Sequence, residues 1–124
     1  MFKLISHRGI VDDFIKENSY VAIKKALDCY KYVGVEVDVW ETLDEEFIIY
    51  HDAFFNSKLV KNLKYQELPK YVPKLKDILE IKSNKIFLFE IKNIDSYDKL
   101  MKVLNKYSNK NIYVMSFSWN IIKN

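Results

Sequence analysis

The sequence contains few of the residues that cross-link a chain or interrupt it. Its single cysteine, Cys29, excludes an intrachain disulfide and a cysteine-based zinc site. Two glycines and two prolines in 124 residues leave little room for linkers or low-complexity segments. No apolar run approaches the roughly 18 residues of a membrane-spanning helix, and the apolar start is too short for a signal peptide. We therefore expect one domain over residues 1–124, with no membrane span and a cytoplasmic (intracellular) location.

The charge of the chain argues against a nucleic-acid-binding protein. The net charge of +3 comes from scattered lysines, and no basic block is present. Lysines in this arrangement favour solubility and a mild attraction for anionic substrates. Hydrophobic residues make up 49% of the chain, which is enough for a core. From composition we expect one folded domain with a mild attraction for anionic substrates.

Apolar runs alternate with stretches of helical periodicity along the chain. Strands are expected at 2–6, 34–39, 85–92 and 112–117, with an antiparallel return arm at 47–50. Helices are expected at 19–32, after Pro73, after a cap at Asp95, and from 118 onward, whereas residues 53–72 show no period. This alternation indicates an α/β fold with a parallel sheet and covering helices.

Carboxylates alternate with valines in the second of these strands, Gly34–Val39. Residues two apart on a strand share a face, so Glu36 and Asp38 point one way, roughly 6.6 Å apart, and the valines point the other way. One interpretation is an edge strand with a polar, solvent-facing side. The other is a site for a divalent cation, because two neighbouring carboxylates repel each other unless a positive charge lies between them.

Other polar residues also fall at strand ends, where parallel α/β folds place their active sites. Each alone is typical of an ordinary surface position, but together they suit phosphodiester cleavage. Carboxylates without cysteine favour a hard cation, Mg²⁺ or Ca²⁺, and histidines can act as acid and base near neutral pH. Arginine and lysine can hold phosphate oxygens. The residues are His7, Arg8, Glu36, Asp38, His51, Asp52, Glu90 and Lys92.

The chain resembles the glycerophosphodiester phosphodiesterase family. The resemblance is carried, in order, by Ser6-His7-Arg8-Gly9, Glu17-Asn18-Ser19, Gly34-Val35-Glu36-Val37-Asp38-Val39, Thr42-Leu43-Asp44, His51-Asp52, Pro73-Lys74-Leu75, Glu90-Ile91-Lys92 and Ser116-Phe117. The family fold is a TIM barrel, and its members hydrolyse glycerophosphodiesters to an alcohol and glycerol 3-phosphate. The resemblance implies that the substrate's own glycerol hydroxyl attacks phosphorus through a cyclic phosphate.

The resemblance also implies a role for each site residue. His7 and His51 would be the general acid–base pair. Glu36, Asp38 and Glu90 would ligate the divalent metal, Mg²⁺ or Ca²⁺, and Arg8 and Lys92 would bind phosphate. Asn18 and Asp52 would contact the site residues without binding metal or substrate themselves, with Asp52 orienting His51 or its loop.

The chain is short for this fold. A complete barrel takes about 250 residues, so we expect a truncated TIM-barrel-like half barrel of about four parallel βα units. The usual Arg-Thr-Thr motif is missing from residues 53–72. Open sheet edges would favour a homodimer. The alternative to an enzyme is a catalytically reduced half-barrel module that binds metal, a phosphodiester or a protein partner.

Overall fold

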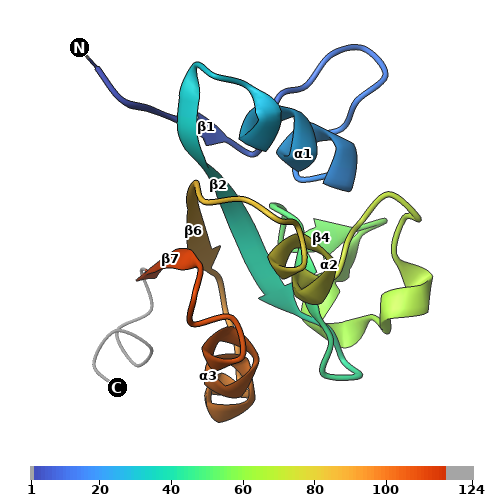
Figure 1. Cartoon of the computed structure of the whole chain (residues 1–124). Coiled ribbons are helices and arrows are strands. Elements are labelled where there is room, and N and C mark those ends of the chain that lie inside the picture. Colours follow the sequence, from blue (N-terminus) through green and yellow to red (C-terminus); the bar gives the residue numbers. More distant parts are fainter. Residues whose placement is uncertain (1, 117–124) are drawn as a thin grey trace.

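The structure is a computed structural model that describes residues 2–116 (Figure 1). Among these residues the main sheet has the strand order β1–β2–β6–β7, with β3 paired to β2 beside that path. The four strands of the path run parallel, and β3 runs antiparallel to β2. The bounds are β1 (Leu4–His7), β2 (Tyr32–Glu41), β3 (Phe47–Ile49), β6 (Ile86–Ile91) and β7 (Asn111–Ser116). The predicted parallel sheet and its return arm are confirmed.

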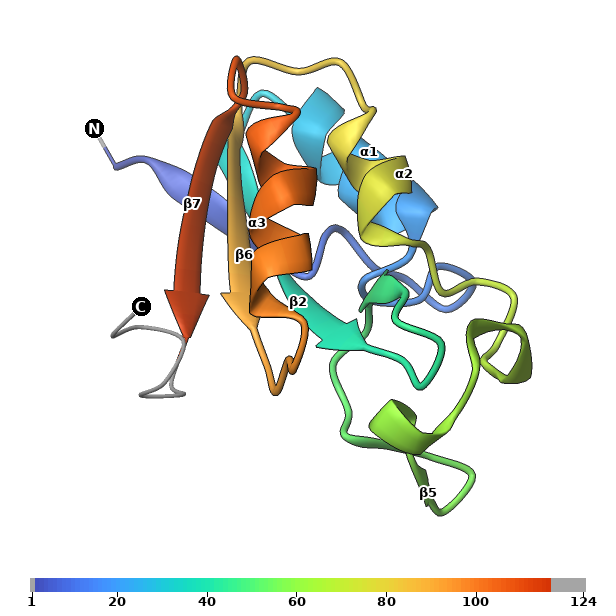
Figure 2. The same ribbon diagram turned by 90° about the horizontal axis from the view of Figure 1, so that it is seen from below.

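Three helices cover one face of this sheet (Figure 2). They are α1 (Tyr20–Asp28), α2 (Leu75–Leu79) and α3 (Tyr97–Asn105). The core lies between the helices and the sheet, where Phe87 and Phe89 of β6 are fully buried. Val35, Val37 and Val39 of β2 are also fully buried, on the face expected from the alternation.

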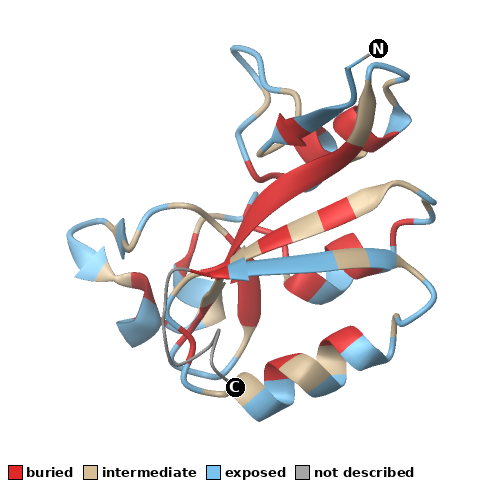
Figure 3. Ribbon diagram, turned by 90° about the vertical axis from the view of Figure 1, so that its left-hand side faces the viewer, coloured by how far each residue is buried: buried red, intermediate tan, exposed pale blue. Residues whose placement is uncertain are grey.

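The central position of β2 rules out the edge-strand interpretation of Gly34–Val39. β2 is hydrogen-bonded to β1 on one side and to β6 on the other. Figure 3 shows β2 buried along most of its length and β7 largely exposed. Gly34 permits this close pairing, because a Cβ there would lie inside contact distance of the Ile86 carbonyl. The carboxylates of β2 therefore lie in the interior of a sheet.

Helix α1 begins as predicted but ends earlier. The Ser19 hydroxyl caps it by accepting a hydrogen bond from Ala22 N at 3.2 Å. The prediction of a helix to residue 32 is wrong, because Tyr32 already belongs to β2. Tyr30, which the helical pattern placed on the apolar face, is 90% exposed.

The start of α3 also differs from the prediction, since its N-cap residue is Ser96 and not Asp95. Glu41, at the end of β2, occupies the cap instead. One oxygen of its buried carboxylate, Oε1, accepts hydrogen bonds from Asp95 N and Ser96 N, both at 3.0 Å. A carboxylate distant in sequence thus satisfies amides at the helix start and complements its dipole.

The segment without periodicity forms a small structure of its own. It contains β4 (Phe54–Phe55), β5 (Lys58–Leu59) and two short 3-10 turns at Val60–Asn62 and Tyr65–Glu67. Its apolar residues pack in a satellite cluster around Ile48, namely Val60, Leu63, Leu68 and Val72. Short turns without a repeating face explain why no period is visible in the sequence.

The expected ends of the chain are only partly testable. Strand β1 begins at Leu4, two residues later than predicted, and includes His7. The predicted helix from residue 118 and the final residue of the predicted strand, Phe117, lie outside the described residues. Within residues 2–116, no helix has the length and apolar character needed to cross a bilayer.

Candidate active site

The register of the central strands brings three carboxylates together. Asp38 of β2 lies directly opposite Glu90 of β6, and Glu36 lies two residues earlier on the same face of β2. One oxygen atom from each of the three carboxylates lies within 4.8 Å of the others. We call these three residues the acidic triad. Its position at the carboxyl ends of parallel strands is the one expected from the sequence.

Two cationic side chains lie beside the triad, each just after one of the strands that flank β2. Arg8, just after β1, places Nε 3.3 Å from Asp38 Oδ2. Lys92, just after β6, places Nζ 3.4 Å from Asp38 Oδ1 and 3.0 Å from Glu90 Oε1. Asp38, which is fully buried, therefore has a cation beside each of its oxygens. Glu36, at 7% exposure, has neither cation within ion-pair distance, and its ion-pair partner is the His7 ring.

The pKa values of the two β2 carboxylates, Glu36 and Asp38, shift in opposite directions. Burial, with the charges of Asp38 and Glu90, raises the pKa of Glu36 to about 7, and Arg8 and Lys92 only partly offset this. Burial would also raise the pKa of Asp38. However, hydrogen bonding with Asn18 and Glu90, together with the charges of Lys92 and Arg8, outweighs burial and lowers that pKa below its usual value. The surroundings of Asp38 thus favour its ionised form, whereas those of Glu36 disfavour it.

The triad fits a divalent cation. Both oxygens of Glu36 are buried and accept no hydrogen bond from the described residues, and the buried Oδ1 of Asp38 accepts none either, with only the Lys92 ammonium 3.4 Å away. Buried carboxylate oxygens without donors are costly unless a positive charge approaches them. All three side chains offer hard oxygen ligands, the type that Mg²⁺ and Ca²⁺ prefer. The residues present therefore suit a bound divalent ion.

Asn18 and Glu17 hold this arrangement from the loop before α1. Asn18 Nδ2 donates to Asp38 Oδ2 at 3.0 Å, and Glu17 Oε2 accepts from Arg8 Nη1 at 2.9 Å. Arg8 and Asn18 both have positive φ, 64° and 58°, and are joined by a backbone hydrogen bond from Asn18 N to Arg8 O of 2.9 Å. Two non-glycine residues in this strained region mark a constrained corner. Glu17 was not among the predicted site residues, although its place beside Asn18 in the sequence motif was a signal.

The two histidines lie differently with respect to the triad. His7 Nε2 is 3.3 Å from Glu36 Oε2, and the ring is largely exposed. His51 follows β3 one residue after Tyr50, whose N donates to Asp38 O at 3.0 Å. The His51 side chain pairs through Nδ1 with Asp52 Oδ1 at 2.8 Å, and its carbonyl accepts from Trp40 Nε1 at 3.0 Å. The His51 backbone is therefore beside the triad, while its ring contacts Asp52.

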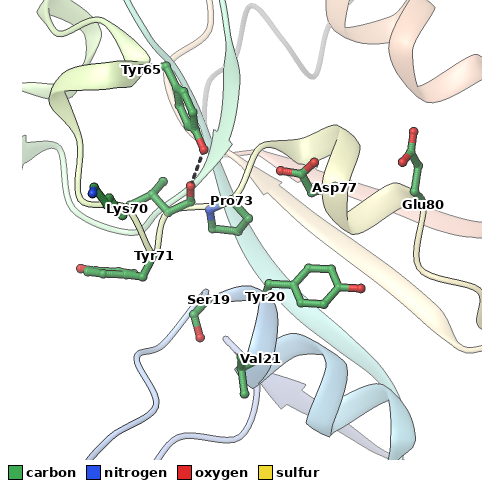
Figure 4. Close-up of a pocket in the computed structure, with 10 residues that line it drawn as sticks. Ser19, Tyr20, Val21, Tyr65, Lys70, Tyr71, Pro73, Asp77 and Glu80 are labelled. Carbon is green, nitrogen blue, oxygen red and sulfur yellow. Dashed lines mark hydrogen bonds between the residues drawn. The ribbon is translucent and has the colours of Figure 1, made fainter.

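A cavity of about 620 Å³ lies beside this site, between the start of α1 and residues 65–80 (Figure 4). Its lining includes Tyr20, Tyr71 and Ser19, the residue after Asn18, but none of the triad. Burial, with the nearby charges of Glu17 and Asp52, raises the pKa of Tyr71. The cavity thus adjoins the charged site without containing it.

Comparisons with known proteins agree with this geometry. The model of the glycerophosphoryl diester phosphodiesterase family matches residues 7–124. Among solved structures, a glycerophosphodiester phosphodiesterase from Agrobacterium tumefaciens is 22% identical with a TM-score of 0.83, and the match covers 99% of this chain and 61% of that one. The corresponding enzyme from Thermotoga maritima is 23% identical, with a TM-score of 0.76 and coverage of 98% and 57%. No match is found among curated proteins.

A third solved structure is a phosphodiesterase from Oleispira antarctica in complex with the product sn-glycerol-3-phosphate. It is 18% identical, with a TM-score of 0.81 and coverage of 98% and 60%. At these identities the likeness shows the fold, and the chain spans about 60% of the length of the structures it matches, as expected of a partial barrel. The family match covers nearly the whole chain, and it begins at His7. The chain therefore belongs to the glycerophosphoryl diester phosphodiesterase family.

Proposed function

We propose that this chain hydrolyses glycerophosphodiesters to an alcohol and glycerol 3-phosphate in a reaction that depends on a divalent cation. The observation that supports this most strongly is the acidic triad, flanked by one arginine and one lysine at the same edge of the sheet. A site of alternating charge suits a phosphodiester, since the carboxylates can bind a cation and the cations can bind phosphate oxygens. The solved structure of the Oleispira antarctica relative with glycerol 3-phosphate supports the substrate class.

Glu36, Asp38 and Glu90 would hold Mg²⁺ or Ca²⁺. When bound, such an ion neutralises phosphoryl charge and lowers the pKa of a nearby hydroxyl group. Arg8 would bind two phosphate oxygens with its planar guanidinium, and Lys92 would supply a further point charge. Both cations already lie within 3.5 Å of a triad oxygen, so a phosphate placed against them is also placed against the bound ion.

His7 and His51 are proposed as the acid–base pair. His7 Nε2 points at the triad and is exposed enough to exchange a proton with the substrate. His51 is held through its Nδ1 by Asp52, which leaves Nε2 to accept or donate a proton. Asp52 is a positioning residue for His51, as Asn18 is for Asp38.

The direct test is release of glycerol 3-phosphate from glycerophosphocholine with Mg²⁺ or Ca²⁺, with and without EDTA. We expect activity that EDTA abolishes and that either ion restores. His7→Ala and Glu36→Gln should each lower kcat by roughly 100-fold or more. Asp13→Asn, which removes one exposed carboxylate outside the site, is the matched control and should leave kcat unchanged.

The same assay distinguishes the alternative of a binding module that turns nothing over. That alternative is favoured by one observation, namely that the chain spans only about 60% of the length of the solved structures it matches. A chain that binds Mg²⁺ or Ca²⁺ in calorimetry but releases no glycerol 3-phosphate would establish it. Activity that is indifferent to EDTA, or that persists in Glu36→Gln, would overturn the assignment of the triad as a metal site.

A further inference from the structure

Helices cover only one face of the main sheet in the described part of the chain. In Figure 2 the three helices lie on one side of β6 and β7, and no helix among residues 2–116 lies on the other side. Side chains two apart on a strand share a face, and paired residues of neighbouring strands share it too, so the register assigns the residues of this open face. Besides the acidic triad, its members include Ile5, Ile86, Leu88, Tyr113 and Met115.

The apolar side chains of the open face are accessible to solvent. Tyr113 and Met115 of β7 are 59% and 36% exposed, and Ile5 of β1 is 41% exposed. Ile86 and Leu88 of β6 are only half-buried. The register places Leu88 between Glu36 and Tyr113, so apolar surface borders the acidic triad directly. Contiguous exposed apolar surface of this kind marks an interaction site.

Strand β7 is an edge without protection. Among residues 2–116 it pairs with β6 alone, and Figure 3 shows it exposed along most of its length. Val114, on the face that the helices cover, is 45% exposed, so β7 presents apolar side chains on both faces. Edge strands are normally blunted by lysine, proline or a bulge, whereas Asn111–Ser116 contains no charge and no proline and pairs in continuous register. Such an edge is typical of a strand that pairs with another strand.

The direction of the strands limits which partner can pair with both edges. The path β1–β2–β6–β7 is parallel throughout, with one edge at β1 and the other at β7. Four parallel strands are half of the eight that close a (β/α)8 barrel. The chain also covers about 60% of the length of the solved structures it matches, so a second group of strands is what the open face lacks.

A second copy of this chain supplies such a group. When a twofold axis runs along the strands, β1 of each copy lies beside β7 of the other, and both junctions are parallel. No edge of the main path then remains unpaired, and the symmetry closes after two copies. Antiparallel pairing of β7 with β7 of a second copy would instead leave both β1 edges and both apolar faces exposed.

We propose that two copies of this chain pair through β7 and β1 into one eight-stranded barrel whose interior is formed by their open faces. The apolar residues of both faces fill the interior, as side chains do in barrels of this strand number. Both acidic triads lie at the same end of the barrel, because all eight strands point the same way. Each candidate site is therefore enclosed on its open side only when the second copy is present.

The first test is light scattering of the purified chain with and without a charge on the open face. We expect a mass of twice 14.9 kDa at micromolar concentration. Tyr113→Lys should raise the Kd of the dimer roughly 1000-fold, since each buried tyrosine is worth roughly 30-fold and two are lost per dimer. Tyr113 is exposed in the single copy, so circular dichroism should show the variant folded.

The matched control is Tyr30→Lys, which makes the same replacement at a 90% exposed tyrosine in the turn between α1 and β2. This variant should remain a dimer. A wild-type monomer at micromolar concentration, a dimer that survives Tyr113→Lys, or equal dissociation of both variants would overturn the proposal.

Cysteine cross-linking tests which strands meet. In a Cys29→Ser background, a chain with Ile5→Cys is co-expressed with a chain that carries cysteine at position 111, 113 or 115 of β7. Mild oxidation should give a mixed disulfide with at least one of the three, because their spacing of two residues leaves one within reach of Ile5. Self-linking of the β7 variants, or no mixed disulfide with any of them, would overturn the β7–β1 pairing.

Discussion

Glu36→Gln should stabilise the metal-free protein at alkaline pH while destroying its metal site. Glu36 is buried beside two other carboxylates, and its pKa is raised from 4.5 to about 7. A group whose pKa is raised in the folded state stabilises the fold fully below the unfolded pKa, and this stabilisation is lost as pH rises through the folded value. The free energy of unfolding of the metal-free protein should therefore fall between about pH 4.5 and pH 7 and stay at the lower value above pH 7.

The size of this effect follows from the two pKa values. The difference between 4.5 and about 7 corresponds to roughly 3 kcal/mol, because one pKa unit is about 1.4 kcal/mol. Glutamine is neutral at every pH and nearly isosteric with protonated glutamate, so the variant avoids the repulsion. Some of the gain is offset because the amide needs its own hydrogen-bond partners in a site built from acceptors. We expect a net stabilisation of about 1–3 kcal/mol at pH 8 and almost none at pH 5.

Urea denaturation in EDTA at pH 5 and pH 8 measures this directly, with Asp13→Asn as the control for loss of an exposed charge. In a second arm, Mg²⁺ or Ca²⁺ at about 100 times its Kd should stabilise the wild type by about 2.7 kcal/mol at pH 8 and leave the variant unchanged. A variant less stable than the wild type at pH 8 in EDTA would refute the reasoning, since it would mean that the Glu36 charge is already well compensated.

Further predictions concern the partners of the triad and the sheet. Asn18→Ala should lower the free energy of unfolding by about 1.5–3 kcal/mol in urea denaturation, because it removes a hydrogen bond to the ionised Asp38. Asn18→Gly removes the same hydrogen bond but tolerates the positive φ of this position, so the difference between the two variants measures the backbone cost. Lys92→Met should destabilise the metal-free protein at pH 8 by about 1–3 kcal/mol, and excess Ca²⁺ in the same titration should restore the loss if the ion replaces the ammonium. Gly34→Ala should lower thermal stability by about 1–3 kcal/mol, since its methyl group would meet the backbone of Ile86, and an unchanged melting temperature would contradict this close strand pairing. Among residues 2–116, β1 and β7 form the edges of the sheet without a further strand beside them, which predicts a homodimer in light scattering; a monomer at micromolar concentration would contradict it.

The parts of the fold that could be predicted are those in which one residue type repeats at the period of its element. Alternating Val35, Val37 and Val39 correctly predicted one buried face of β2, and Ala22 and Ile23 correctly placed α1 against the sheet. The predicted C-terminal end of α1 was wrong because Tyr30 continues the helical pattern in the sequence, whereas its side chain is exposed in the structure. Periodicity indicates a face and does not reveal whether a neighbour covers it.

The cap of α3 shows a different limit. Asp95 and Ser96 are both good cap residues by type, but the hydrogen bonds at the helix start go to Glu41, more than fifty residues earlier. Local rules consider only side chains within a few residues of a helix end. A cap supplied by another strand depends on the sheet order, which no local pattern contains.

Part of the candidate site could likewise be predicted from the sequence and part could not. The convergence of Glu36, Asp38 and Glu90 could be predicted, because parallel strands place their carboxyl ends at one edge. The resemblance also implied that Asp52 orients His51 or its loop, and the His51 ring does contact Asp52. The sequence did not indicate how the cations would be shared among the carboxylates, because this depends on side-chain rotamers and on the positive φ of Arg8 and Asn18, which have no signal in composition or spacing.

The sharing of cations decides which carboxylate depends on a bound metal. Asp38 has Arg8 at 3.3 Å, Lys92 at 3.4 Å and Asn18 at 3.0 Å, so its charge is compensated by the chain itself. Glu36 is also buried but has only the His7 ring at 3.3 Å as an ion-pair partner, and its pKa rises to about 7. A divalent ion at the triad needs Glu36 in its ionised form, so below pH 7 binding must displace a proton from Glu36, and the affinity for the ion should fall as pH drops. The chain thus preorganises one metal ligand with its own cations and leaves a second to be ionised by the ion it binds.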